Sequence, residues 1–90
     1  MDSHHKMQIM DKMVRELDDI VHSQTSLLKK IAQLEADNIN LGDKVLESKL
    51  PDIHSHVDDA LTDAIALQTE FQAIRDKFAD SYTPPVEAGS

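Results

Sequence analysis

A repeat of apolar side chains, seven residues long, runs through the first half of the chain from Met10 to Val45. With Met10 at position a of a repeat lettered a to g, apolar residues occupy most of the a and d positions. The a positions are Met10, Leu17, Gln24, Ile31, Asn38 and Val45, and the d positions are Met13, Ile20, Leu27, Leu34, Leu41 and Ser48. A repeat of about 3.5 residues per turn keeps one stripe of a helix against a partner helix. This half of the chain therefore predicts one long packed helix.

A second repeat of the same kind follows, out of phase with the first. Its a positions are Leu50, Val57, Ala64, Phe71 and Phe78, and its d positions are Ile53, Ala60, Leu67 and Ile74. The phase slips just before Pro51, and proline lacks the backbone N–H that a helix interior needs, although the first turn of a helix accepts it. We therefore predict a helix over 6–48, a break at 48–52 and a second helix over 52–82.

The pair Gly42-Asp43 offers an alternative turn. Glycine readily adopts the left-handed conformation that ends helices, and aspartate caps the start of new ones. A turn here makes the two helices nearly equal in length. Because the first repeat keeps its phase as far as Val45, we prefer the break near Pro51 and keep Gly42 as the alternative.

Both ends of the chain are predicted to be disordered, over 1–5 and 83–90. Asp2 or Ser3 can cap the first helix, and the pair Pro84-Pro85 cannot continue the second one. The fold class predicted for 6–82 is all-α, a long antiparallel two-helix hairpin or coiled coil that oligomerisation completes into a helical bundle. The residues expected to form its core are Leu27, Ile31, Leu34, Leu67, Phe71, Ile74 and Phe78.

A hairpin that turns near Pro51 leaves the start of the first helix without an internal partner, because the second helix is the shorter one. Apolar e positions and Ile9 at g widen the stripe in this N-terminal part, which favours more than one neighbouring helix. Asn38 at an a position can fix the register of an oligomer. The predicted protein interface comprises Ile9, Met10, Met13, Val14, Leu17, Ile20, Val21 and Asn38.

Composition narrows the class of partner. The 90 residues carry 17 acidic and 9 basic side chains, a net charge of −8, which argues against direct nucleic-acid binding. Cysteine is absent, so disulfides and thiolate metal sites are excluded. No apolar run approaches the roughly 20 residues of a membrane span, and we expect no membrane contact. The expected location is cytoplasmic, or intracellular in a host cell.

Candidate chemistry is sparse. His54 and His56 are two residues apart, so on a helix their side chains diverge and cannot share a metal ion. A pairing of either with acidic neighbours, sensitive to pH, is the more reasonable role. Adjacent acids such as Asp18-Asp19 diverge in the same way, and no nucleotide-binding or hydrolase motif is present. We expect no enzyme activity, cofactor, metal or small-molecule substrate.

These patterns predict a structural or interaction protein that assembles through coiled-coil packing, with itself or with other subunits. It would act as a small subunit, scaffold or adaptor of a larger complex. The alternative is a small acidic inhibitor, of the phage or mobile-element type, that occupies a basic groove of a nucleic-acid-binding target. It is motivated by the acidic second half of the chain, where residues 51–90 carry eight acids and two bases.

Overall fold

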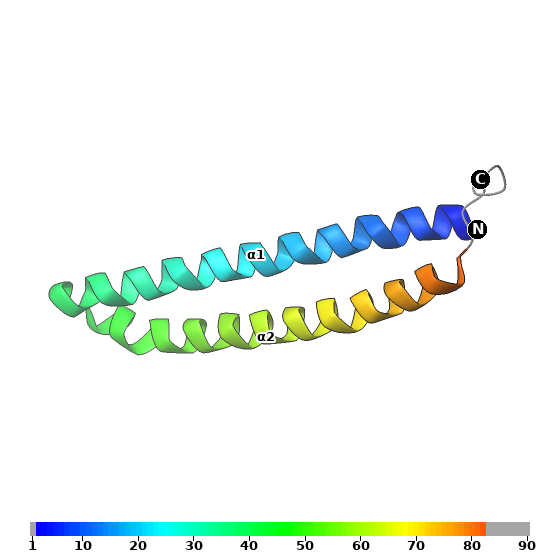
Figure 1. Ribbon diagram of the computed structural model, residues 1–90. Helices are drawn as coiled ribbons and strands as arrows, with labels where there is room; N and C mark the ends of the chain where they lie inside the picture. The colour runs from blue at the N-terminus through cyan, green and yellow to red at the C-terminus, as the bar shows by residue number, and fades with distance from the viewer. Residues whose placement is uncertain (1, 83–90) are drawn as a thin grey trace.

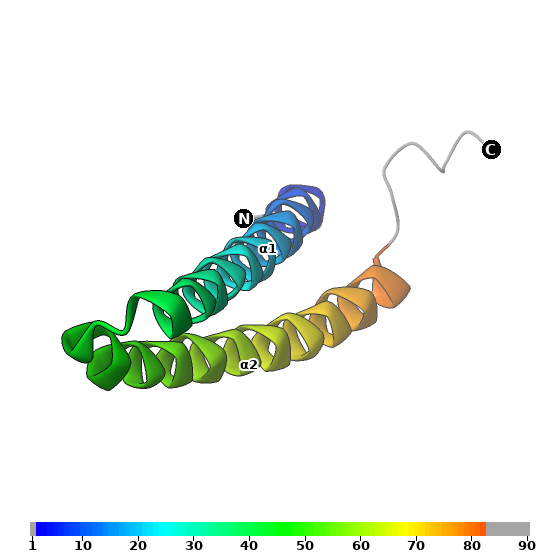
Figure 2. The same cartoon turned by 90° about the vertical axis from the view of Figure 1, so that its left-hand side faces the viewer.

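The computed structural model describes residues 2–82, which form two long helices packed antiparallel as a hairpin (Figure 1). Helix α1 spans Ser3–Leu41 and helix α2 spans Lys44–Ser81. Viewed from a second direction, the two helices still run side by side (Figure 2). The molecule is a rod of 68 × 18 × 17 Å. The predicted all-α hairpin is confirmed, and the described residues outside the helices serve as caps or form the turn.

The chain turns at Gly42-Asp43, so the predicted break at 48–52 is wrong. Gly42 has φ 72°, in the left-handed region, and its N–H donates to the Asn38 carbonyl at 2.7 Å. The Asp43 side chain caps α2 by accepting from the Leu46 N–H at 2.9 Å. Pro51 lies inside α2. This turn gives helices of 39 and 38 residues, so each covers the other over its full length, which a turn near Pro51 would prevent.

The first helix begins earlier than predicted. Asp2 is its N-cap, and the Asp2 side chain accepts from the His5 N–H at 2.8 Å. Disorder was expected over 1–5, and that prediction is wrong for Ser3 to His5, which are helical. The capping role offered for Asp2 is confirmed. The predicted disorder of residue 1 and of 83–90 lies outside the described residues.

Three hydrogen bonds between the helices set their register. They join His4 to Tyr82 at 2.7 Å, Asp11 to Arg75 at 2.8 Å, and Asp18 to Gln68 at 3.1 Å. In each pair the two residue numbers add to 86, so residues related in this way lie at the same level along the rod. The end of α2 thus reaches the beginning of α1. The predicted N-terminal overhang is absent, and that prediction is wrong.

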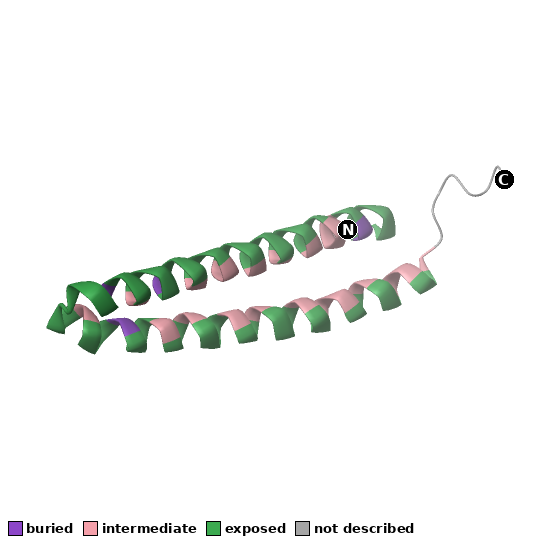
Figure 3. Ribbon diagram, turned by 60° about the vertical axis from the view of Figure 1, so that its left-hand side comes forward, coloured by how far each residue is buried: buried purple, intermediate pink, exposed green. Residues whose placement is uncertain are grey.

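The seam between the helices is built from the a and e positions of both repeats (Figure 3). In α1 the buried or half-buried seam residues are Met7, Met10, Val14, Leu17, Val21, Gln24, Leu28, Ile31, Glu35 and Asn38. In α2 they are Leu50, His54, Val57, Leu61, Ala64, Gln68, Phe71, Arg75, Phe78 and Tyr82. No described side chain is fully buried, and the least exposed, Ile31, still exposes 5% of its surface. One helix–helix seam is therefore all the core that this chain makes by itself.

The predicted core is only partly correct. Ile31 is buried, and Phe71 and Phe78 are half-buried in the seam. The other four, which all occupy d positions, are exposed: Leu27, Leu34, Leu67 and Ile74. The prediction assumed an a/d seam, whereas the hairpin uses its a and e positions.

Candidate functional site: an open apolar face

The d positions of both helices face the same side of the hairpin. Successive residues of an α-helix are about 100° apart, which places d about 80° from the midline between a and e. The two helices run in opposite directions and meet through their a and e positions, so this rotation carries both d rows to one side. A groove on that side confirms the arrangement, because it is lined by Met13, Glu16, Leu17, Ile20, Leu67 and Phe71.

Four layers of paired d residues follow one another along this side. The register sets four pairs within one residue of the same level, which are Met13 with Ile74, Ile20 with Leu67, Leu27 with Ala60, and Leu34 with Ile53. The seven large apolar residues among them each expose between 43% and 54% of their surface. Contiguous apolar surface of this kind marks protein interaction sites more often than isolated apolar residues do. We call this surface, defined by the eight d residues above, the open face.

The opposite side of the hairpin is mainly polar, and its large exposed apolar residues, Ile39 and Ile65, do not adjoin each other, so among the described residues only one side carries a continuous apolar face. There the Arg75 Nε donates to Asp11 Oδ1 at 2.8 Å, and Gln68 Nε2 donates to Asp18 Oδ1 at 3.1 Å. Arg75 Nη1 also donates to Asp76 Oδ1 at 3.2 Å. The hydrogen bonds to Asp11 and then Asp76 raise the pKa of Arg75 above its ordinary value, so the guanidinium stays charged. The contacts to Asp11 and Asp18 join α1 to α2, so the hydrogen-bonding groups of Arg75 and Gln68 have partners within the hairpin.

Charged residues at the g positions form the rim of the open face. On α1 they are Glu16, Lys30 and Asp37, with Ser23 between them, and on α2 they are Lys49, His56, Asp63, Glu70 and Lys77. All are exposed. Setting histidine aside, the rim carries four acids and three bases, whereas the whole chain carries 17 acids and 9 bases. The rim is thus close to neutral in a strongly acidic protein.

The predicted interface residues divide between the seam and the open face. Met10, Val14, Leu17 and Val21 are half-buried in the seam with α2, and Ile9 is half-buried at the edge of the stripe. Met13 and Ile20 lie on the open face. Sequence reasoning missed the α2 members of this face, as well as Leu27 and Leu34, which it assigned to the core. The signal was present, because apolar e positions beside apolar a and d positions indicate a stripe too wide for one partner helix.

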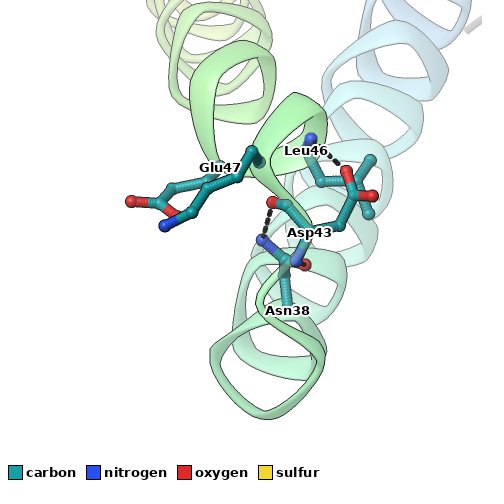
Figure 4. Close-up of polar contacts among 5 residues, drawn as sticks. Asn38, Asp43, Leu46 and Glu47 are labelled. Atoms are coloured by element: carbon teal, nitrogen blue, oxygen red, sulfur yellow. Dashed lines mark hydrogen bonds and ion pairs between the residues drawn. The ribbon is translucent and has the colours of Figure 1, made fainter.

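Asn38 has an intramolecular role at the turn (Figure 4). Its side chain accepts from the Asp43 N–H at 2.9 Å and donates to the Asp43 carbonyl at 3.0 Å. Only 8% of its surface is exposed, and both ends of its amide have partners within the chain. Asn38 therefore stabilises the turn of its own chain, and its predicted part in fixing the register of an oligomer stays a prediction.

A second group of exposed apolar residues lies near the turn. Ile39 exposes 82% of its surface, Leu41 73% and Val45 67%. Ile39 occupies a b position, on the side away from the open face, and lines a hollow with Leu50 and Pro51. It is a useful control residue, because it is apolar and exposed but outside the open face.

The described residues offer little for chemistry. Between Asp2 and Tyr82, no three histidine or acidic side chains come together as metal ligands would. His54 is half-buried in the seam, while His56 is exposed on the rim. In the same range, no helix has the length and apolar character needed to cross a membrane.

Comparisons with protein families, with curated proteins and with solved structures find no match to this chain. Its function is therefore argued from the hairpin and its open face.

Proposed function

We propose that this chain is a non-enzymatic interaction protein that packs lengthwise on other helices through its open face. It would serve as a small subunit, scaffold or adaptor of a larger complex. The observation that carries the proposal is the apolar surface along the hairpin, in which seven large side chains remain about half exposed. Exposed apolar surface costs about 25 cal/mol per Å² relative to burial, so covering it with further helices stabilises an assembly.

The shape of the hairpin supports the same proposal. Two helices present parallel rows of apolar side chains, and a third or fourth helix that lies along the groove between them extends the seam into a coiled-coil bundle. The groove beside Met13, Ile20 and Leu67 is apolar and shallow, without the convergent polar groups of a small-molecule site. An intracellular location is part of this proposal, since the absence of cysteine suits a reducing compartment.

The alternative function, an acidic inhibitor that mimics nucleic acid, finds less support. The acids of α2 are spread around the helix, with Asp58, Asp59 and Asp63 at b, c and g positions. Asp76 is engaged by Arg75 and by Gln72 within the chain. The outer side of α2 does carry acids at c and g positions, which are Asp52, Asp59, Asp63, Glu70 and Asp80. Lys49 and Lys77 occupy g positions of the same side, so these acids do not form the uninterrupted row of negative charge that would mimic a nucleic acid.

The test is the native mass of the chain in an extract of the cells that make it. The variant Ile20→Lys/Leu67→Lys places two charges on the open face, and Ile39→Lys is the matched control on the other side. We expect the wild type and the control to migrate in a complex well above the chain mass of 10.1 kDa, and the double variant to be released from it. A wild-type chain that migrates alone, or a double variant that stays in the complex, would contradict the proposal.

A further inference from the structure

We propose that the occupant of the open face is a second copy of this chain, reversed end to end, so that two hairpins form an antiparallel four-helix bundle. The inference rests on the proposed function and names the partner. It is argued from the size of the face, from the charge of its rim and from the packing of its layers.

The open face has the size that a stable dimer needs. The open face extends from the level of Ile9 to the level of Asp37, which is 28 residues of helix, or about 42 Å. The rod is 18 Å wide. Two such faces in contact bury about 1,500 Å² in total, which is the ordinary size of a specific protein interface. A single foreign helix in the groove would cover only part of this width, whereas a second hairpin covers all of it.

The charge of the rim suits a second copy. A protein with net charge −8 repels its own copies over most of its surface. The rim is the exception, because it holds three of the nine basic residues but only four of the seventeen acidic ones. A face selected for a basic partner would carry an acidic rim. This near-neutral rim instead lets two identical faces approach each other.

Two arrangements bring the open faces of two copies together with twofold symmetry. In one, the copies point the same way and α1 of each lies over α2 of the other, so equal levels meet. In the other, one copy is reversed, α1 lies over α1, and the symmetry axis passes near the level of Ser23, which is the middle of the four d layers. The two arrangements bring different residues together.

The reversed arrangement packs the layers more evenly. With equal levels in contact, Leu27 and Ala60 of both copies share one layer, which holds two small side chains and leaves a void. With one copy reversed, that pair meets Ile20 and Leu67 of the other copy. Each of the two central layers then contains one alanine and three large side chains, so no layer holds two small side chains.

The rim charges give each arrangement both attractive and repulsive contacts, so they provide a test of the choice while the packing of the layers carries it. Reversal brings Glu16 of each copy level with Lys30 of the other, because the two residues are equally far from Ser23. With equal levels in contact, Glu16 instead meets Glu70, and Asp37 meets Lys49. On α2, reversal sets Asp63 against its own copy at the axis and Lys49 near Lys77 toward the ends. The Asp63 pair is thus an identifiable repulsion at the centre of the dimer.

The first experiment measures the mass of the purified full chain by sedimentation equilibrium over a wide concentration range. We expect twice the chain mass of 10.1 kDa for the wild type and for Ile39→Asp. Ile20→Asp should remain monomeric while keeping its helical circular dichroism. A wild type that is monomeric at every concentration, or a mass above that of a dimer, would overturn the inference.

Charge variants test the rim. Glu16→Lys should weaken the dimer, and the added change Lys30→Glu should restore it, because the swapped pair again joins opposite charges. Asp63→Asn should tighten the dimer by removing the repulsion at the axis. If Glu16→Lys/Lys30→Glu dimerises no better than Glu16→Lys alone, the reversed arrangement is wrong.

The orientation is read directly from a distance between spin labels. Since the chain contains no cysteine, Asn40→Cys gives one label per copy. Asn40 is 17 residues from Ser23, so reversal separates the two labels by about 50 Å. A label at Ser23→Cys, close to the axis, is the control and should give a short distance. A short distance between labels at position 40 would refute reversal.

The failure of this inference is distinct from the failure of the proposed function. If the purified chain is monomeric but its complex in cell extracts still depends on the open face, the partner is another protein and only this inference fails. If substitutions on the open face change neither the mass of the purified chain nor its complex in cell extracts, the inference and the proposed function both fail.

Discussion

Asn38 and Asp43 close the hairpin through two reciprocal hydrogen bonds (Figure 4). The Asn38 amide accepts from the Asp43 N–H at 2.9 Å and donates to the Asp43 carbonyl at 3.0 Å. The amide oxygen thereby satisfies the Asp43 N–H, which has no helical partner, and the amide nitrogen adds a second bond to the Asp43 carbonyl, which also accepts from the Glu47 N–H at 3.0 Å. One buried side chain thus fixes the direction in which α2 leaves the turn.

Asn38→Ala removes both bonds and leaves the Asp43 N–H without its partner, while the Asp43 carbonyl keeps its bond from the Glu47 N–H. We expect the free energy of unfolding to fall by about 1–3 kcal/mol, measured by urea denaturation followed by circular dichroism. Asn40→Ala is the control, because Asn40 is exposed on the same turn of α1 and makes no side-chain hydrogen bond among the described residues. Equal losses in the two variants would show that the Asn38–Asp43 bonds contribute nothing to stability.

Gly42 is held in a conformation that other residues adopt at a cost. Its φ is 72°, and a Cβ added there would meet no atom within 4 Å, so the cost of a substitution comes from the backbone alone. Gly42→Ala should lower stability by about 1 kcal/mol, and Gly42→Asn by less, because asparagine tolerates this conformation better. Thermal melting of both variants shows whether Gly42→Asn is more stable than Gly42→Ala, as expected. A Gly42→Ala protein as stable as the wild type would contradict this explanation of the turn.

Pro51 weakens the helix that contains it. A proline inside a helix removes one backbone hydrogen bond and costs about 3 kcal/mol relative to alanine. We expect Pro51→Ala to stabilise the hairpin by about 1–3 kcal/mol in chemical denaturation. Pro51→Gly should gain about 1 kcal/mol less, since it restores the N–H but not the helix propensity. A Pro51→Ala protein less stable than the wild type would mean that the proline shapes the hollow beside Ile39 and Leu50.

The ion pair between Asp11 and Arg75 contributes modestly to stability. Its two side chains are 38% and 30% exposed, and ion pairs that solvent reaches contribute little to stability. Asp11→Asn should therefore cause only a small loss of stability at low salt, and the loss should shrink as ionic strength rises. Asp59→Asn, which removes an exposed acid that forms no ion pair in the described range, is the control. A loss that does not change with salt would show that the interaction is not ionic.

The sequence predicts the number, type and antiparallel pairing of the helices, because the apolar repeat is long and Gly42 and Pro51 both punctuate it. It does not decide between these two turn signals. Val45 continues the first repeat only by coincidence, since the structure leaves 67% of its surface exposed. The choice depends on the pairing of whole helices, which no local pattern contains.

The open face was harder to predict for a related reason. A stripe that fills positions a, d and e has two possible seams, and the sequence of one helix does not say which of them the hairpin uses. The structure places Leu28 and Val57 in the seam and leaves Leu27 and Leu34 outside it. The residues left out are the ones that carry the proposed function.

The central claim is that another copy of the chain covers the open face. The most direct test is the rate at which a thiol at Leu27→Cys reacts with a maleimide, compared with a thiol at Ile39→Cys, in dilute and in concentrated solutions of the purified chain. Leu27 lies in the middle of the open face, whereas Ile39 lies on the other side with 82% of its surface exposed. We predict that position 27 reacts much more slowly than position 39 in concentrated solution, and that dilution far enough to dissociate the dimer speeds labelling at position 27 alone. A thiol at position 27 that reacts as fast as one at position 39 in concentrated solution would contradict the account.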